Sequence, residues 1–361
     1  MMMGLTYTVL YTIGFLIMLK WNRLHQLGGT IMKYLSAQDI QACFSMKDAI
    51  AADKAALASY SAGQADIPLR TNLDVPDHHG QSLFMPGYVR GHQPALGMKI
   101  VSVYPDNARQ GLPSVPATMV VMDAHTGIVS AILDGTYLTQ LRTGAVQGAA
   151  TDLLARADSR TALLIGTGGQ AMSQLIAMLT VRPLTKVYIA DRDYAKAQRF
   201  VSRATAQLAD RFTATFEAIP DPNAVVVDVD IITCVTTAHD PVFDGHLIRP
   251  GTHINGIGAY TPAMHEVPTN AIAQADRIFV DTEDGTLAEA GDLLAALHGD
   301  QIDRSAITGE LGQLVNGNVT GRTADQEITF FKTVGTAVLD VVVASQIVDR
   351  AKEQGIGTDL N

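Results

Sequence analysis

Cysteine and charged side chains are both scarce in this chain, and each shortage excludes a class of protein. The 361 residues include two cysteines, Cys43 and Cys234, which lie far apart and form no CxxC pair, so a disulfide framework is not expected. No cluster of histidine, cysteine and acidic residues has the spacing of metal ligands, and we expect no bound metal. Charged residues make up 17%, with a formal net charge of −10, so the positive field that nucleic-acid binding needs is lacking. Apolar residues make up 47%, which excludes a disordered chain, and at about 150 residues per domain the length predicts two domains.

Long hydrophobic runs are also missing, with one exception near the start of the chain. Leu5–Leu19 is a run of 15 uncharged residues that precedes Lys20 and Arg23. A membrane-spanning helix needs about 20 apolar residues, so the run is short for one. Residues 1–31 are therefore either an anchor whose flanking cations hold the protein in the cytoplasm, or a disordered or mis-assigned extension before a start at Met32. We expect a cytoplasmic protein, with membrane contact only if this leader is real.

The middle of the chain alternates short apolar runs, typical of buried strands, with helical stretches. Thr161–Ile165 leads into the turn GTGGQA at 166–171 and then into a helix, and a second strand ends at Asp191. This is the βαβ fingerprint of dinucleotide binding, in which glycines let the backbone approach a pyrophosphate and a helix N-terminus binds it. Asp191 can accept both ribose hydroxyls, which favours NAD, whereas Arg192 leaves NADP as an alternative.

Further strands are expected after the fingerprint, and the chain before it follows a different pattern. One strand ends near Thr236 and another ends in the turn at 255–260, and both places should line the cofactor cleft, because ligands bind beyond the carboxyl ends of parallel strands. The N-terminal part predicts a helix over Asp39–Ala62 and then a meandering sheet, while Glu327–Arg350 predicts one long returning helix. The fold class is α/β: a Rossmann domain over 147–321, and a second, α+β domain from 32–146 plus 322–361.

Three cations stand out in this acidic chain: Arg70, Lys99 and Arg142. Lys99 lies in a strand between apolar residues, and a buried cation is costly without a partner. Arginine binds a carboxylate through two parallel hydrogen bonds and lysine adds a point charge, so three converging cations would hold an amino-acid or keto-acid carboxylate. Taken alone, each fits an internal salt bridge or a solvated position better than a ligand site, and sequence spacing does not establish that they converge.

Over residues 32–354 the chain resembles the ornithine cyclodeaminase/mu-crystallin family. The matching segments are IPLR (67–70), MP (85–86), GMKIVSVYPDN (97–107), GLPSVPA (111–117), LRTGA (141–145), GTGGQA (166–171), INGIGAYTP (254–262), EAGD (289–292), GRTADQEITFFKTVG (321–335) and Asp340. The resemblance implies a Rossmann domain, a substrate-binding domain that forms a homodimer, and NAD(P)-dependent hydride transfer at a carbon bearing an amine or imine.

The resemblance also implies roles for individual residues. Arg70, Lys99, Arg142 and Val334 would bind a small amino-acid or imino-acid substrate, with Arg142 also near the cofactor. Together with the fingerprint, it assigns to the cofactor Ser114, Thr143, Gly166, Gly168, Gly169, Gln170, Ala171, Asp191, Arg192, Thr236, Ile254, Asn255, Gly256, Ile257, Tyr260 and Thr333.

Two departures from the family pattern bear on the activity. Ornithine cyclodeaminases carry an aspartate where this chain has Tyr260, and an acid where it has Leu83. A tyrosine, with an ordinary pKa of about 10, donates a hydrogen bond at neutral pH and does not replace a carboxylate base. The site should therefore be apolar near Leu83, Phe84 and Tyr260, which disfavours a dibasic amino acid.

We therefore expect an NAD(P)-dependent imino-acid reductase or amino-acid dehydrogenase. Lys99 would donate the proton to nitrogen, because Arg70 and Arg142 nearby would lower its pKa, and Tyr260 would assist through its hydroxyl. Two alternatives stay open: an ornithine cyclodeaminase that recycles bound NAD, and a non-catalytic ligand-binding protein of the mu-crystallin type.

Overall fold

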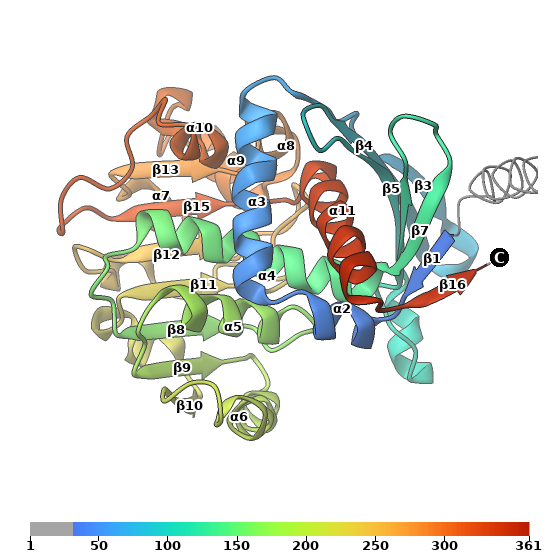
Figure 1. The fold of residues 1–361 in the computed structure, drawn as a ribbon. Helices are drawn as coiled ribbons and strands as arrows, with labels where there is room; N and C mark the ends of the chain where they lie inside the picture. Colours follow the sequence, from blue (N-terminus) through green and yellow to red (C-terminus); the bar gives the residue numbers. More distant parts are fainter. Residues whose placement is uncertain (1–31, 361) are drawn as a thin grey trace, which may run out of the picture.

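A computed structural model describes residues 32–360, in which two β-sheets are joined through a layer of helices (Figure 1). The run at 5–19 and the expected leader lie outside these residues. Within 32–360, no helix has both the length and the apolar character needed to cross a membrane. The predicted α/β fold class is confirmed.

The first sheet comes from the N-terminal third of the chain and its last strand. Its order is β16-β1-β7-β6-β5-β4-β2, with β3 also paired to β4. Within the described strands of this sheet, β1 and β7 are parallel and the other neighbouring pairs are antiparallel. Burial alternates along β5, which places Lys99 and Val101 on the face covered by helices. The strands are β1 (Met32–Leu35), β2 (Ala65–Asp66), β3 (Thr71–Val75), β4 (Gly80–Val89), β5 (Ala95–Val103), β6 (Ala117–Met122), β7 (Val129–Asp134) and β16 (Thr358–Leu360).

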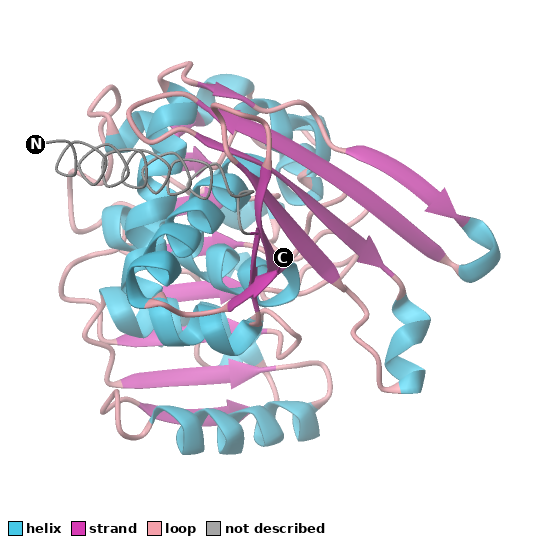
Figure 2. Cartoon of the chain, turned by 45° about the vertical axis from the view of Figure 1, so that its right-hand side comes forward, coloured by secondary structure: helices cyan, strands magenta, loops and turns pink. Residues whose placement is uncertain are grey.

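The second sheet is parallel throughout its described strands, with the order β10-β9-β8-β11-β12-β15-β13-β14. Its carboxyl ends point toward the first sheet, so the loops after these strands face the strands of the other half (Figures 1 and 2). The strands are β8 (Thr161–Ile165), β9 (Lys186–Ala190), β10 (Thr215–Ile219), β11 (Ile231–Cys234), β12 (His253–Gly256), β13 (Arg277–Val280), β14 (Ile307–Glu310) and β15 (Thr329–Lys332).

Helices α3, α4 and α11 lie between the two sheets and carry much of the larger core (Figure 1). Small residues let α4 pack closely, since a Cβ on Gly144 would lie 2.6 Å from the carbonyl oxygen of Ser173 on α5. The helices are α2 (Ala37–Cys43), α3 (Met46–Ser61), α4 (Gly135–Leu154), α5 (Ala171–Val181), α6 (Tyr194–Leu208), α7 (Thr269–Ala273), α8 (Glu283–Glu289), α9 (Gly291–His298), α10 (Leu311–Val315) and α11 (Ala337–Gln354).

Two helix predictions need correction. The single helix expected over Glu327–Arg350 is wrong at its start, because 329–332 form β15 and the helix begins only at Ala337. Both faces of β15 are buried, and Gly335 turns the chain at a positive φ of 81° before α11. The helix expected over Asp39–Ala62 is two helices, because Phe44 is extended and Ser45 begins a new capping box.

Candidate active site

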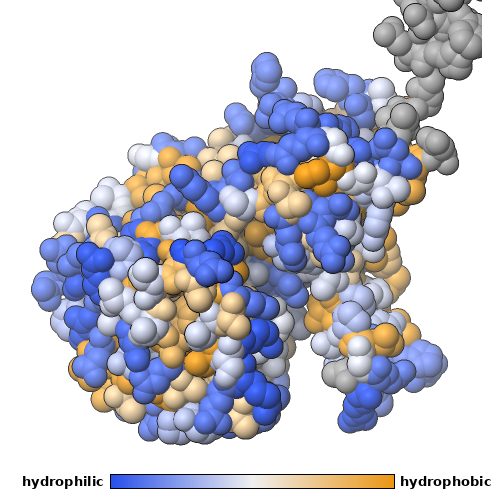
Figure 3. Space-filling model, turned by 60° about the horizontal axis from the view of Figure 1, so that its bottom comes forward, coloured by the Kyte–Doolittle hydropathy of each residue, from blue (hydrophilic) through white to orange (hydrophobic). Residues whose placement is uncertain are grey.

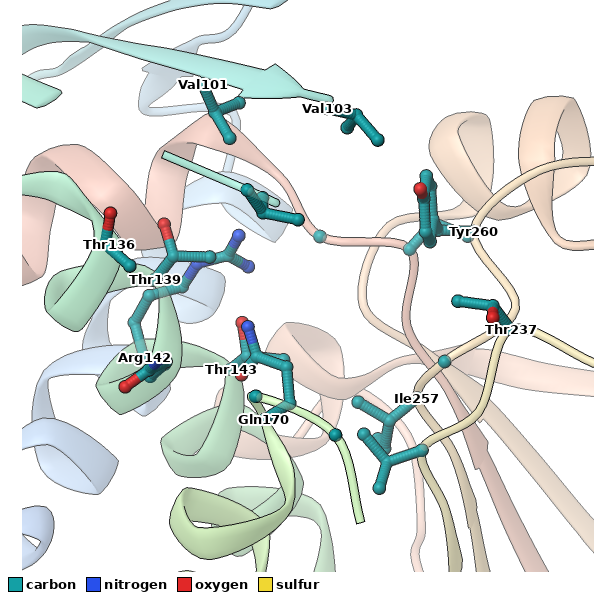
Figure 4. A pocket seen from close by; sticks show the side chains of 18 of the residues that line it. Val101, Val103, Thr136, Thr139, Arg142, Thr143, Gln170, Thr237, Ile257 and Tyr260 are labelled. Carbon is teal, nitrogen blue, oxygen red and sulfur yellow. The ribbon is translucent and has the colours of Figure 1, made fainter. Parts of the chain in front are cut away.

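A cavity of about 450 Å³ lies between the carboxyl ends of the parallel strands and the strands β4 and β5. Its walls come from both halves of the molecule, which is hollowed on one face (Figure 3). Arg142 reaches into the cavity from α4, Tyr260 faces it from the opposite side, and Val101 and Val103 form a further wall (Figure 4).

A second cavity of about 660 Å³ adjoins the first and contains the fingerprint turn. It is lined by Gly166, Asp191 and Arg192, and it shares Gly168 and 235–237 with the first cavity. The two therefore form one continuous cleft along the carboxyl edge of the sheet, long enough for an extended ligand with two different ends.

The first cavity brings together the three cations singled out in the sequence. Lys99 and Arg142 are 1% and 5% exposed, and both contact Asp340 of α11, which is fully buried. The Lys99 Nζ lies 2.7 Å from one carboxylate oxygen of Asp340, and the Arg142 Nε lies 2.9 Å from the other. The internal salt bridge and the shared site are thus both present, since two cations share one acid.

Burial, followed by the positive charge of Arg142, lowers the pKa of Lys99 from its ordinary value to about 8, although Asp340 opposes the shift. The predicted direction is confirmed, with burial as the larger cause. A lysine with this pKa is protonated at neutral pH and yet can release its proton readily, which suits a general acid. Burial raises the pKa of Tyr260, so its hydroxyl stays protonated.

Arg70 stands at the edge of the same cavity and has its own acidic partner. Its guanidinium donates to both carboxylate oxygens of Glu289, at the end of α8. Arg70 thus converges on the site with the other two cations while its charge is paired across the cleft.

The wall opposite the nucleotide-side loops is apolar. Leu83, Met85, Val101 and Val103 line it, in agreement with the expectation for Leu83. Phe84 does not line the cavity, because alternate residues of β4 point to opposite faces of the sheet. None of the described residues that line this cavity is acidic.

The fingerprint turn has the features that a dinucleotide requires. Gly166 has φ of 104°, and a Cβ on Gly168 would meet nothing within 4 Å, which leaves room for a phosphate against the backbone. Helix α5 has no side-chain cap at its N-terminus. The buried side-chain oxygens of Thr139 and Gln170, both in the cavity wall, have no partner within the described part of the chain, so each could accept a hydrogen bond from a ligand.

Asp191 is bound to the fingerprint turn. One of its carboxylate oxygens accepts from the backbone N–H and the hydroxyl of Thr167, at 3.0 and 2.6 Å. Partial burial would raise the pKa of Asp191, but these hydrogen bonds outweigh it and the pKa is lowered. The acid is therefore ionised beside the turn, where it can accept hydrogen bonds from ribose hydroxyls.

Four predicted cofactor residues do not line the cleft. Ile254, Asn255 and Gly256 lie inside β12, which is buried on both faces, and the Asn255 amide donates to Thr151 and Thr233. Ala171 is buried, and its N–H donates to the carbonyl oxygen of Gly168. The predicted residues that do line the two cavities, besides the three cations, are Ser114, Thr143, Gly166, Gly168, Gly169, Gln170, Asp191, Arg192, Thr236, Ile257, Tyr260, Thr333 and Val334.

Glu266 and Asp281 hold the cleft loops, a role that the sequence reasoning missed. Glu266 is fully buried and accepts from the Thr236 N–H and hydroxyl and from the backbone N–H groups of 258 and 259. Asp281 accepts from the Thr333 hydroxyl and from the backbone N–H groups of 334 and 335. An acid at the end of a buried strand was the available sequence signal for Asp281.

Asp292, the last residue of the motif EAGD, also supports the cleft loops. Asp292 is fully buried, accepts from Lys332 at 2.8 Å and receives the backbone N–H of Glu266 at 2.6 Å. His253, at the amino end of β12 and away from the cleft, is structural: burial, aided by Arg322, lowers its pKa to about 3, so it is neutral. Within residues 32–360, no group of three or more His, Cys, Asp or Glu is placed to hold a metal.

Residues 31–355 match the model of the ornithine cyclodeaminase/mu-crystallin family. The chain belongs to this family. The motifs that carried the resemblance are thus explained by the structure: the cations and the fingerprint line the cleft, while EAGD and the lysine of FFKTVG support its loops.

Relatives of known activity cover nearly the whole chain. A Δ1-pyrroline-2-carboxylate reductase of Bacillus cereus is 36% identical over 329 residues, which are 91% of this chain and 99% of the relative. The solved structure of the Thermococcus litoralis Δ1-pyrroline-2-carboxylate reductase, in complex with NADH and L-proline, is 36% identical with a TM-score of 0.86, covering 91% of this chain and all of that one. The solved structure of an archaeal alanine dehydrogenase dimer with bound NAD is 30% identical with a TM-score of 0.82, and the match covers 91% of this chain and 99% of that one.

Proposed function

We propose that this family member is an NAD-dependent reductase of small cyclic imino acids, with Δ1-pyrroline-2-carboxylate as the model substrate and proline as the product. The observation that carries the proposal is the convergence of Lys99, Arg142 and Arg70 on a small cavity with an apolar wall, next to a dinucleotide cleft. The activities of the relatives support it. The fingerprint turn and Asp191 would hold NADH, which when bound would supply the hydride for the imine carbon.

The protein's own residues position and protonate the substrate. Arg142, with a buried Nη1 that has no partner in the described chain, binds the carboxylate. Arg70 stands at the rim, where its charge is paired with Glu289. The apolar wall at Leu83 and Val101 packs on the ring carbons and excludes water. Lys99 gives a proton to the nitrogen as the carbon is reduced, and Val334 and Tyr260 close the remaining sides.

The cleft also supports a choice between the alternatives. An ornithine cyclodeaminase must bind a second amino group, and no acidic residue among those described lines the substrate cavity. The three cations favour a site for anionic substrates over a purely structural cofactor pocket. Asp191 beside the turn favours NAD, while the exposed Arg192 in the same cavity keeps NADP as the second candidate cofactor.

We also propose a homodimer. The archaeal alanine dehydrogenase relative is described as a dimer. In this chain Tyr34 and Leu360, on β1 and β16 at one edge of the first sheet, are 41% and 38% exposed, and Leu73, on β3 near the opposite edge, is 55% exposed. A second copy would cover exposed apolar side chains of this kind. Analytical ultracentrifugation of the wild type and Leu73→Asp tests this: a monomeric wild type would refute it.

The decisive experiment follows NADH absorbance with Δ1-pyrroline-2-carboxylate, using protein that starts at Met32. We expect NADH oxidation that is lost in Arg142→Ala and retained in Arg199→Ala, a control on α6 with a side chain that is 65% exposed. Equal activity in both variants would refute the carboxylate site. Ammonia release from ornithine by the wild type would instead favour the cyclodeaminase, and NADH binding with no turnover of imino or amino acids would favour a binding protein.

A further inference from the structure

Asp53 in α3 is a buried acid that the proposed reaction does not use. Its side chain is fully buried, and neither carboxyl oxygen has a hydrogen-bond partner among the described residues. A buried carboxylate without hydrogen bonds is among the most unfavourable groups in a protein interior, so the residue needs an explanation.

The groups around Asp53 belong to the floor of the substrate cavity. Arg142 on α4 and Asp340 on α11 are near enough for their charges to act on its carboxyl, and Asp340 in turn pairs with Lys99 of β5. Other titratable groups on the packed elements are engaged elsewhere or point to solvent: Asp152 pairs with Lys54 and Arg182, Arg350 pairs with Asp48, Glu310 accepts from Ser61, and Asp66 is exposed. Helices α5 and α10, which also contact α3, contain no titratable side chain.

The protonation of Asp53 follows from this environment. Burial raises the pKa of its carboxyl well above the ordinary value, and the nearby charge of Asp340 adds to the rise, while Arg142 opposes it. Arg142 does not donate a hydrogen bond to Asp53, and its ion-pair contact is with Asp340, whose nearer carboxylate oxygen lies 2.9 Å from the Arg142 Nε. No direct partner therefore stabilises the ionised form.

We propose that Asp53 remains a neutral carboxylic acid and thereby sets the charge of the substrate cavity. Lys99 and Arg142 contribute two positive charges and Asp340 one negative charge, so a neutral Asp53 leaves one positive charge for the substrate carboxylate. An ionised Asp53 would cancel that charge and leave the floor neutral. Asp53 is then a positioning residue that acts through Arg142 and Asp340 without touching the substrate.

This inference rests on the proposed function for its substrate, but not for its first test. Asp53→Asn replaces the neutral acid by a neutral amide of the same shape, and Asp210→Asn, at an exposed position, is the matched control. A raised carboxyl pKa makes the folded state bind one proton more than the unfolded state, so wild-type stability falls as the pH rises from the unfolded pKa toward the folded one. We expect urea unfolding between about pH 4.5 and 7 to show this fall relative to Asp53→Asn.

Two further readouts are direct. The infrared spectrum should contain the C=O band of a protonated carboxylic acid in wild type and in Asp210→Asn, and lose it in Asp53→Asn. Calorimetry with pyrrole-2-carboxylate, a planar ring carboxylate, in the presence of NAD should give wild type and Asp53→Asn the same affinity at neutral pH within about twofold, with equal proton uptake.

Opposite results overturn the inference. If Asp53→Asn binds pyrrole-2-carboxylate about tenfold more tightly at neutral pH, or wild type alone takes up a proton on binding, Asp53 is ionised in the free protein. An unchanged infrared spectrum or a parallel pH dependence of stability leads to the same conclusion. If Asp53→Asn does not fold, Asp53→Leu, which is also neutral, replaces it in every measurement. Failure of the reductase assay leaves the unfolding and infrared tests intact.

Discussion

Replacement of Asp340 by asparagine tests the charge balance of the site most directly. Asp340 is fully buried and serves both Lys99, at 2.7 Å, and Arg142, at 2.9 Å. Removing one partner of a buried ion pair costs about 3–5 kcal/mol, because the other charge is left uncompensated. Here one acid serves two cations, so simple addition would give about 6–10 kcal/mol, enough to unfold many domains.

The lysine has a way to reduce that cost. With a pKa of about 8, releasing its proton at pH 7 costs about 1.4 kcal/mol, and loss of Asp340 lowers the pKa further. Arg142 cannot be deprotonated and keeps its charge. We therefore expect Asp340→Asn to lose about 3–5 kcal/mol in its free energy of unfolding at neutral pH, with Lys99 neutral in the variant.

The direction in which the stability difference between wild type and Asp340→Asn changes with pH separates this account from simple misfolding. Lys99 has a depressed pKa in the folded state, so each protein gains stability once the pH exceeds that folded pKa, because the unfolded state then binds more protons. In Asp340→Asn the pKa of Lys99 is lower still, so the variant begins to gain stability at a lower pH than the wild type does. The stability difference should therefore shrink as the pH rises toward about 8.

Urea unfolding followed by circular dichroism at several pH values measures this difference. The matched control is Asp359→Asn, which removes the partner of Lys33 from a pair whose acid is 55% exposed, and we expect a loss below about 1 kcal/mol. A loss below about 1 kcal/mol for Asp340→Asn, or a loss that grows with pH, would refute the reasoning.

Three more predictions concern catalysis. In the reductive direction kcat/KM should fall above about pH 8 as Lys99 loses its proton, whereas proline oxidation should rise to a plateau there; a fall in both directions would exclude Lys99 as the proton donor. Glu266→Gln removes one of the two oxygens that accept from backbone N–H groups in two cleft loops. Hydrogen bonds to charged groups are worth about 1.5–3 kcal/mol each, so the loops should no longer be held for the cofactor. The Kd for NADH, measured by fluorescence, should rise at least about tenfold. Unchanged NADH binding would contradict that role. Gly335→Ala places a Cβ 2.9 Å from Arg142 Nη1 at a positive φ, so the KM for the imino acid should rise with strain of about 1–3 kcal/mol, while the Kd for NADH stays the same.

Local pattern determined the nucleotide-binding half well. The strand, the turn GTGGQA, the following helix and Asp191 are contiguous in the sequence, and each depends on backbone chemistry within a few residues. Lys99 in an apolar strand already indicated a buried cation with a lowered pKa. The family motifs identified the remaining functional segments, because they preserve these short-range features.

Only the tertiary structure decided how distant segments meet. The cavity floor combines Lys99 from β5, Arg142 from α4 and Asp340 from α11, and no local pattern specifies that two cations share one acid. Asn255 was assigned to the cofactor because it was expected just beyond the carboxyl end of a parallel strand, yet it lies inside β12 and its side chain turns inward, since both faces of β12 are covered. The burial of β15 between β12 and β13 likewise depends on neighbours from elsewhere in the chain. Short-range propensity thus determined the elements, whereas long-range packing determined their partners, and with them the charge of the site.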